Sequence, residues 1–456
     1  MRPGGTLFPL PRTIRSTAAP AIPARPAPVF PRRKNAACVH RLTRFPMRNI
    51  LLLAAAAAAL AAPVCAQRAP VAPRRPPLAA SADTNSAQAY MALGIENVAQ
   101  RPQLAADAFY WAAEIDPGSA DALYGRYTAQ LMSDPRRLVD YWQGTRRVVR
   151  SPEVQRMDSL YFRALTMNPF LYRRFEGDVF RTYLRGLARK ELESSEGGHS
   201  VPESVVDRWV TMTMQNGGPS LRAQDAYGRG NFEEALRLYD QAVREARRKS
   251  WLRTERARLF AHVQNDSAAA AEFGLAISDL RREDARDIVY LYESKALLEF
   301  GVGQLHERMG NHDAAREAYG RAIAEDLAFY PAHVRLGMLA MAAGDTATAV
   351  SEMSLAAEGG AVEPTVGYAY AAVLARAGRV DDAVASLQGV ITRAPYYADP
   401  YLVLGALHDG QGRQAEALAA YRGFVARAAR SHPRRAAAEG RIRDLEAAGA
   451  PSTGGR

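Results

Sequence analysis

The small and apolar residues of the C-terminal part of the chain return with a period of 34 residues. Four glycines keep this period without a slip, and an alanine follows each glycine at a distance of five residues. A strict period of this length is typical of stacked helix–turn–helix units, none of which buries its apolar face alone. The repeating positions are Gly310, Gly344, Gly378, Gly412, Ala315, Ala349, Ala383 and Ala417.

The remaining columns of the repeat fit two antiparallel helices joined by a turn. A small residue stands seven positions before each turn glycine, and a larger residue stands nine positions after it. The small residue lets the two helices approach closely, and the larger residue fills the space between them. We expect each glycine to adopt a left-handed backbone in the turn. Pro331, Pro364 and Pro400 are expected to begin helices, where a proline loses no hydrogen bond.

On these columns the chain resembles the tetratricopeptide repeat family. The clearest match is Leu404-Gly405 followed by Ala417 and Tyr421. The resemblance implies an all-α fold, namely a right-handed α-solenoid of helix-turn-helix repeats that is preceded by a disordered leader and linker. An alanine-rich helical bundle with coincidental spacing is the alternative.

The repeat pattern divides the folded part of the chain into segments. Four in-register repeats occupy 296–430, and degenerate repeats occupy 216–295. An N-terminal repeat at 87–130, with Gly94 and Phe109, matches if its turn differs in length by one residue. The remaining boundaries enclose a diverged helical segment at 131–215, a capping helix at 431–449 and a disordered tail at 450–456.

The diverged segment at 131–215 lacks the period and is rich in aromatic residues. Its apolar spacing predicts helices from Pro152 to Met167, from Phe170 to Leu192 and from Pro202 to Met214. The aromatic residues recur at helical spacing, which favours diverged repeats with an aromatic core. A specificity insert that holds a ligand pocket is the alternative interpretation.

The distribution of charge argues against a nucleic-acid partner. The formal net charge is +11, but residues 1–82 contain thirteen basic residues and no acidic residue. Residues 83–456 therefore carry 46 Lys and Arg against 48 Asp and Glu, a net charge of −2. Binding to phosphate groups requires a basic face on the folded part of the protein, so we expect no nucleic-acid partner.

The basic leader has the anatomy of an export signal. A basic start at Met47 precedes an apolar run from Ile50 to Ala62, and Ala66 completes a small-x-Ala cleavage site. The apolar run is shorter than the roughly 20 residues that span a bilayer, so we expect no transmembrane span in the mature chain. We therefore expect a secretory signal peptide at 47–66.

The predicted signal peptide has consequences for the residues on either side of it. Residues 1–46 are expected to be a mis-called or disordered extension, and residues 67–85 a proline-rich linker. The expected location is the periplasm. Acylation of Cys65, which would make the protein an outer-membrane lipoprotein, is the alternative.

Catalytic and metal-binding motifs are missing from the sequence. It contains no His-Glu-x-x-His, Gly-x-Ser-x-Gly or Gly-x-x-x-x-Gly-Lys-Ser/Thr motif. The eight histidines form no pair at ligand spacing. We expect no enzyme, metal or cofactor. An envelope hydrolase with its site in 131–215, or a lipid-anchored assembly factor of the outer membrane, are the alternatives.

The resemblance also implies where a partner would bind. In this family the first helix of each repeat lines the concave surface, and such surfaces bind peptides or other proteins. We expect a non-enzymatic adaptor of the bacterial cell envelope whose partner is another protein or peptide, with methionine, aromatic and arginine residues as anchors. The candidate binding residues are Phe300, Gln304, Arg308, Met338, Tyr368 and Arg376.

Overall fold

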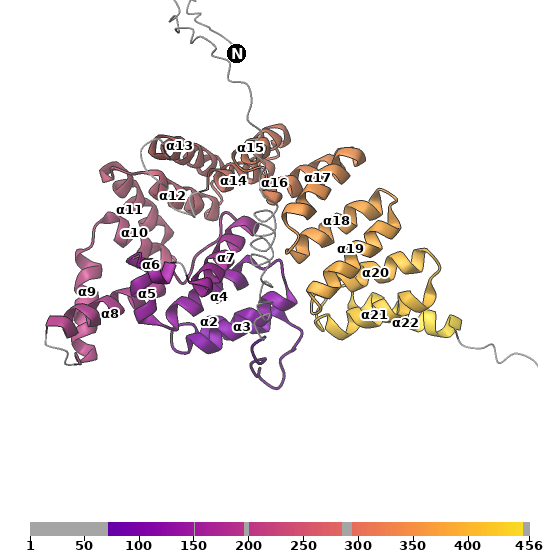
Figure 1. The fold of residues 1–456 in the computed structure, drawn as a ribbon, viewed down its shortest axis with the longest axis horizontal. Coiled ribbons are helices and arrows are strands. Elements are labelled where there is room, and N and C mark those ends of the chain that lie inside the picture. The colour runs from indigo at the N-terminus through magenta and orange to yellow at the C-terminus, as the bar shows by residue number, and fades with distance from the viewer. Residues whose placement is uncertain (1–71, 150, 196–199, 285–293, 450–456) are drawn as a thin grey trace, which may run out of the picture. The chain divides into compact units, whose positions relative to one another are not determined.

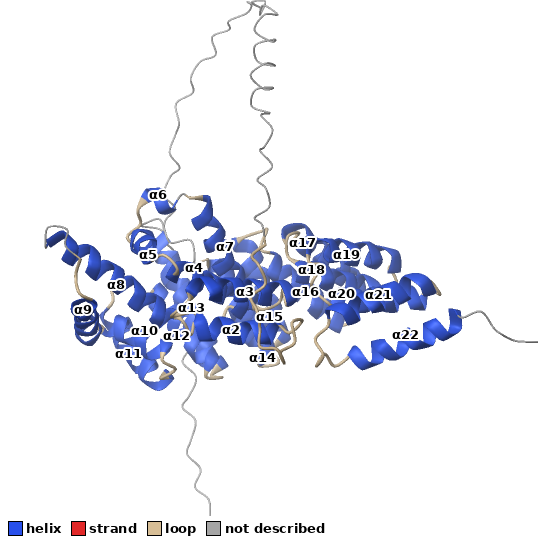
Figure 2. Cartoon of the chain, turned by 90° about the horizontal axis from the view of Figure 1, so that it is seen from below, coloured by secondary structure: helices blue, strands red, loops and turns tan. Residues whose placement is uncertain are grey.

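The computed structural model describes residues 72–149, 151–195, 200–284 and 294–449. The expected extension 1–46, the expected signal peptide 47–66 and the expected tail 450–456 lie outside these residues. Every regular element in the described part of the chain is a helix, and no strand occurs there (Figure 2). The predicted all-α class is therefore confirmed.

The helices follow one another with short connections (Figure 1). They are α2 Ala87–Asn97, α3 Pro102–Ile115, α4 Ala120–Met132, α5 Pro135–Trp142, α6 Arg146–Val149, α7 Pro152–Met167, α8 Glu176–Ser195, α9 Glu203–Asn216, α10 Pro219–Gly228, α11 Phe232–Glu245, α12 Ser250–His262, α13 Asp266–Asp284, α14 Lys295–Arg308, α15 His312–Glu325, α16 Tyr330–Ala342, α17 Thr346–Gly359, α18 Pro364–Arg376, α19 Val380–Arg393, α20 Asp399–Gly410, α21 Gln414–Arg427 and α22 Arg435–Gly449.

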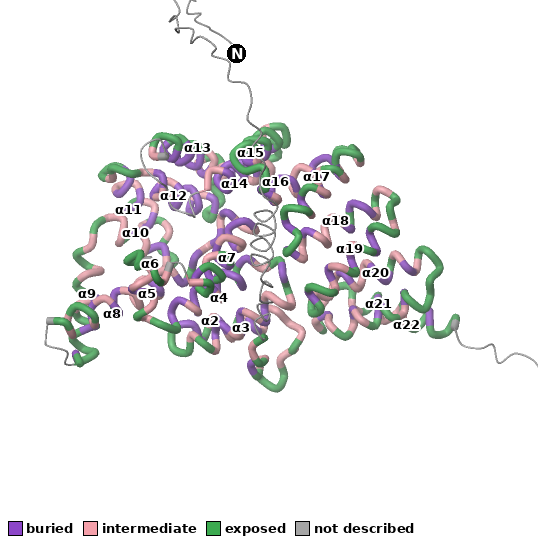
Figure 3. The backbone as a smooth tube through the Cα atoms, in the orientation of Figure 1, coloured by how far each residue is buried: buried purple, intermediate pink, exposed green. Residues whose placement is uncertain are grey.

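The C-terminal helices form antiparallel pairs that stack in chain order. The pairs are α14 with α15, α16 with α17, α18 with α19 and α20 with α21, and α22 packs on α21. Buried residues lie where helices face each other, whereas the turns are exposed (Figure 3). At Gly405 an added Cβ would lie 2.8 Å from the ring of Tyr421, which shows how closely the two helices approach. The solenoid of helix pairs is as predicted.

The turn glycines adopt the left-handed backbone that the repeat pattern predicts. The φ angles are +77° at Gly310, +83° at Gly344, +77° at Gly378 and +72° at Gly412. Gln264 has a φ of 62° and is the single non-glycine residue with a positive φ in the described residues. Three predicted prolines lie in the first turns of α16, α18 and α20. The turns of the array therefore follow the sequence repeat closely.

The diverged segment interrupts the chain order. Helix α4 packs on α7 rather than mainly on α5, and α5 and α10 both pack on α8. The helix predicted from Pro152 to Met167 is observed as α7 with the same bounds. The helix predicted to begin at Phe170 is α8, which begins six residues later, at Glu176. The cause is local: Asn168 Oδ1 accepts a hydrogen bond from the Phe170 amide at 3.0 Å, and Pro169 cannot continue a helix.

A buried cluster of charges joins this loop to α12. Arg173, Glu255 and Arg258 are at most 6% exposed. Arg173 is paired with Glu255 and donates to the Tyr161 hydroxyl at 3.1 Å, while Arg258 lies 2.7 Å from Glu255 and donates to the Pro169 carbonyl at 3.1 Å. Because these bonds satisfy charges that are costly to bury, the cluster fixes the position of the loop on the degenerate repeats.

Contacts between residues far apart in the sequence also join the early helices to the late repeats. Arg163 of α7 makes a two-pronged ion pair with Glu363, at 2.5 and 2.8 Å, just before α18. The Asn85 side chain donates to the Ala426 carbonyl at 3.0 Å. These contacts go beyond the nearest-neighbour packing of a simple helical array.

Candidate functional site

The predicted binding strip begins at a residue that the structure buries. Phe300 of α14 is 2% exposed, and its ring packs against Tyr319 at 5.7 Å and against Phe329 at 5.6 Å between centroids. It belongs to a hydrophobic core to which α3, α4, α7, α15 and α16 also contribute. Phe300 is therefore a core residue and does not present its ring to a partner, contrary to its expected role.

Arg308 at the end of the same helix has partners within the chain. Its guanidinium lies 2.8 Å from Asp266 and donates to the Ala261 carbonyl at 3.3 Å. It also lies 5.5 Å from the centroid of the Phe170 ring. These groups join α14 to the preceding helix pair, so Arg308 stabilises the stack, and Gln304 beside it is half-buried.

Met338, Tyr368 and Arg376, on α16 and α18, remain at the surface, and we call them the α16–α18 strip. Met338 is 40% exposed, and Arg376 is exposed and has no ion pair within the described residues. Tyr368 is half-buried against Tyr397, with 5.6 Å between the ring centroids, and burial raises its pKa above the ordinary value. An apolar residue, an aromatic ring and an arginine without an ion pair in the described residues therefore lie on α16 and α18.

The other charged residues near the ends of these first helices are already paired. Glu307 of α14 accepts a hydrogen bond from the Tyr319 hydroxyl and lies 2.7 Å from Arg335. Asp409 of α20 lies 2.6 Å from Arg441 of α22, and this hydrogen bond lowers the pKa of the carboxyl group. Both acids therefore hold helices together. Of the two predicted arginines, Arg308 has an ion pair, whereas Arg376 has none within the residues that the structure describes.

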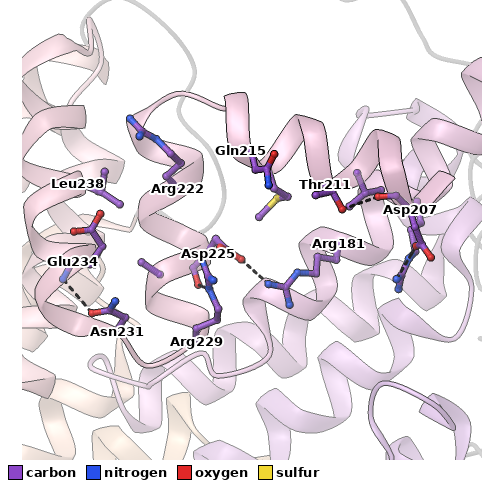
Figure 4. Close-up of a pocket in the computed structure, with 14 residues that line it drawn as sticks. Arg181, Asp207, Thr211, Gln215, Arg222, Asp225, Arg229, Asn231, Glu234 and Leu238 are labelled. Atoms are coloured by element: carbon purple, nitrogen blue, oxygen red, sulfur yellow. Dashed lines mark hydrogen bonds and ion pairs between the residues drawn. The ribbon is translucent and has the colours of Figure 1, made fainter. Parts of the chain in front are cut away.

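A second candidate site is a cavity of about 690 Å³ between α8, α9, α10 and α11. Its wall combines an apolar part with four arginines and three acids (Figure 4). The lining residues are Arg181, Arg185, Asp207, Val210, Thr211, Met214, Gln215, Arg222, Asp225, Ala226, Arg229, Asn231, Glu234 and Leu238. Sequence reasoning named none of them, because they come from four helices that share no motif.

Most charges of this cavity are neutralised within its wall. Asp225 lies 2.8 Å from Arg181 and is also paired with Arg229, while Asp207 lies 3.0 Å from Arg185. Arg222 has no ion pair within the described residues and points away from these pairs in Figure 4. The two aspartates of the cavity wall are therefore held by arginines of the same wall.

The described residues hold no other arrangement that suggests chemistry. In that part of the chain, no three His, Cys, Asp or Glu side chains gather as metal ligands would. None of the described helices is both long enough and apolar enough to cross a bilayer. His333, one of the buried histidines, lies 2.8 Å from Glu352 and links the two helices of its pair.

A comparison with protein families identifies the repeat. Residues 300–328, which cover the end of α14, its turn and α15, match the family model described as tetratricopeptide repeat. The same geometry of a small residue facing a larger one, with a left-handed glycine between them, recurs in the following pairs. The α14–α15 pair therefore matches a tetratricopeptide repeat, and the following pairs share its turn geometry. The first helices of these pairs are α14, α16, α18 and α20, and the predicted binding residues lie on α14, α16 and α18.

Solved tetratricopeptide repeat proteins resemble parts of the chain. YrrB, a repeat protein with an unusual peptide-binding site, is 17% identical and aligns over 44% of this chain and 97% of its own, with a TM-score of 0.35. The C-terminal part of a repeat protein from Cytophaga hutchinsonii is 16% identical over 45% of this chain and 77% of its own, with a TM-score of 0.37. MamA is 15% identical over 38% of this chain and 87% of its own, with a TM-score of 0.31.

No curated protein matches the sequence.

Proposed function

We propose that the protein is a non-enzymatic interaction scaffold of the bacterial cell envelope that binds a peptide or a partner protein along the first helices of its repeats. Tetratricopeptide repeats supply an extended surface rather than a deep reactive site, and proteins of this architecture use it for binding. The observation that carries the proposal is the α16–α18 strip, where an exposed methionine and an unpaired arginine lie on neighbouring repeats.

The strip suits an extended peptide segment with at least one acidic group. Arg376 would hold a carboxylate through two parallel hydrogen bonds, which is the geometry that guanidinium groups favour. Met338 adapts its shape to an apolar side chain, and Tyr368 offers a ring whose position is fixed by Tyr397. Phe300 is buried in the core and Arg308 is paired with Asp266, so neither takes part in this binding mode.

Cross-linking in the native cell tests the proposal. A photoreactive residue at Met338 should capture a specific partner, whereas the same residue at Leu355, which is 46% exposed on α17, should not. Arg376→Glu should reduce the captured amount about tenfold, as expected for the loss of a charged hydrogen bond. The same change at Arg443, an exposed residue of α22, is the matched control and should have no effect.

The outcome that counts against a scaffold role is equally concrete. If Met338 and Leu355 capture the same proteins, or if Arg376→Glu and Arg443→Glu behave alike, the strip is not the binding surface.

Periplasmic location is part of the proposal and rests on the leader at 47–66. Cell fractionation followed by N-terminal sequencing tests it: a chain that keeps residues 47–66 and stays with cytoplasmic markers would refute export.

A further inference from the structure

The segment that precedes α2 places an arginine among three aromatic rings. The guanidinium carbon of Arg75 lies 4.5 Å from the centroid of the Trp111 ring, 5.3 Å from that of Tyr396 and 5.7 Å from that of Tyr90. The Trp111 and Tyr396 rings meet edge to face at 5.1 Å. We call these three residues the aromatic cage.

The walls of the aromatic cage come from both ends of the described chain. Tyr90 belongs to α2 and Trp111 to α3, whereas Tyr396 lies in the connection between α19 and α20. The indole N–H of Trp111 also donates to the Pro73 carbonyl at 3.1 Å, so the cage binds backbone as well as side chain.

The cage holds its arginine without an acidic partner. Arg75 has no ion pair within the described residues, and its Nε is buried without a hydrogen bond there. Attraction between the cation and the ring faces is therefore the main interaction, and it strengthens where water is excluded. The neighbouring Arg74 is exposed, so the site distinguishes one arginine from the next.

The residues around Arg75 have the chemistry of a recognition peptide. Pro73, Pro76 and Pro77 restrict the backbone to extended conformations, which lowers the entropy that binding costs. Pro76 is buried, and no regular secondary structure forms between residues 72 and 79. Docking of a proline-rich segment onto aromatic rings is a recurrent binding mode.

We propose that the aromatic cage is a binding site for an extended peptide that carries an arginine between prolines, and that residues 72–78 occupy it as an exchangeable ligand within the same chain. The bound segment makes one hydrogen bond, one set of cation–π contacts and an apolar contact of Leu78 with the cluster that contains Tyr90 and Trp111, and it buries one proline. A separate peptide of the same chemistry can make all of these contacts. Release of the segment then exposes a preformed surface for such a partner.

This inference does not rest on the proposed function, because it uses a different surface. Residues 82–85 continue the segment to the last repeat, where the Arg430 amide donates to Asp83 at 2.5 Å and Arg430 Nη2 donates to the Ala82 carbonyl at 3.2 Å. These two contacts keep the segment close to the cage when Arg75 leaves it. A tethered ligand of this kind competes with a free peptide at a high effective concentration.

Competition with a labelled peptide tests the inference. The probe is a fluorescent peptide with the sequence of residues 72–79, and its anisotropy is measured with the full chain. Arg75→Ala should empty the cage and raise the affinity for the peptide about tenfold over the wild-type chain. Arg74→Ala is the matched control and should bind the peptide as the wild-type chain does.

Two further variants locate the binding. A peptide in which alanine replaces the residue equivalent to Arg75 should not bind to the Arg75→Ala chain. Tyr396→Ala in the Arg75→Ala chain should weaken binding of the peptide about fivefold through loss of one ring. The Tyr396 side chain is 40% exposed, so its removal leaves no buried cavity. In the wild-type chain, excess peptide should increase hydrogen exchange at residues 74–82, which provides a readout without any substitution.

The inference is overturned if the Arg75→Ala and Arg74→Ala chains bind the peptide equally. It is also overturned if the peptide binds as well without its second arginine, or if hydrogen exchange at residues 74–82 does not respond to it. In each of these cases residues 72–78 are a permanent part of the fold.

Discussion

The turn at Gln264 offers a stability test that depends on backbone conformation alone. Gln264 stands 34 residues after Gly230, whose φ is +76°, and so occupies the turn position of the degenerate repeat. Its side chain is exposed, and its φ of 62° lies in the region that favours glycine. Replacing Gln264 by glycine should therefore relieve strain without removing a packed side chain.

The expected gain follows from two opposing terms. A non-glycine residue in the left-handed region costs roughly 1–2 kcal/mol. Glycine loses more conformational freedom on folding than other residues, and this loss offsets about 0.5–1 kcal/mol of the strain that the substitution relieves. Gln264→Gly should therefore raise the free energy of unfolding by about 0.5–1 kcal/mol.

The reverse change should have the opposite sign. Gly344 has a φ of +83°, and an added Cβ would meet nothing within 4 Å. The cost of Gly344→Ala is then a backbone cost of about 1 kcal/mol rather than a clash.

Urea titrations followed by far-ultraviolet circular dichroism measure both changes. Gln264→Ala is the control, because it removes the side chain and keeps the strained backbone, and it should stay within about 0.5 kcal/mol of the wild type. The reasoning fails if Gln264→Gly is no more stable than Gln264→Ala, or if Gly344→Ala matches the wild type.

Three further predictions concern contacts between helices. Arg163→Ala leaves the carboxylate of Glu363, which is 2% exposed, without its partner, and should cost about 3 kcal/mol in a denaturant titration; combination with Glu363→Gln should recover part of this loss. Gly303→Ala places a methyl group against the tyrosine ring of the facing helix and should lower stability in thermal melts by about 1–3 kcal/mol. Gly320→Ala, whose added Cβ has open space around it, should raise stability by up to about 1 kcal/mol. A hydrogen bond from the α22 arginine lowers the pKa of Asp409, so the link between α20 and α22 is complete above about pH 4 and is lost as the pH falls through the lowered pKa. Amide exchange in α22 should rise in that acid range for the wild type and show no such step for Asp409→Asn.

The fold was predictable where local geometry repeats. The glycine column predicts turns because only a left-handed residue closes them cheaply, and the angles at Gly310 and Gly378 agree with it. The facing columns predict close helix contact because Gly405 leaves room for the ring of Tyr421. Within the diverged segment, spacing alone could not predict that α4 skips to α7, since long-range packing decides it.

The candidate site was less predictable, because burial is a property of the whole assembly. Phe300 occupies a position that faces the concave surface in a repeat considered alone, but in the assembled array its ring is buried against Tyr319 and Phe329. Arg308 pairs with Asp266 from the preceding pair, a partner that no local pattern indicates. Met338 and Arg376 lie on later repeats, and both stay exposed. Local sequence therefore places a residue on a helix face but does not say what covers that face.

The bond between Asn85 and the Ala426 carbonyl has a consequence for how the protein comes apart. A linear row of repeats frays from its ends, and each unit melts with only its neighbours. Here the first and last units hold each other, so loosening either one weakens the other at once. Under mechanical pulling or heating, we expect one abrupt loss of order in place of a series of small steps.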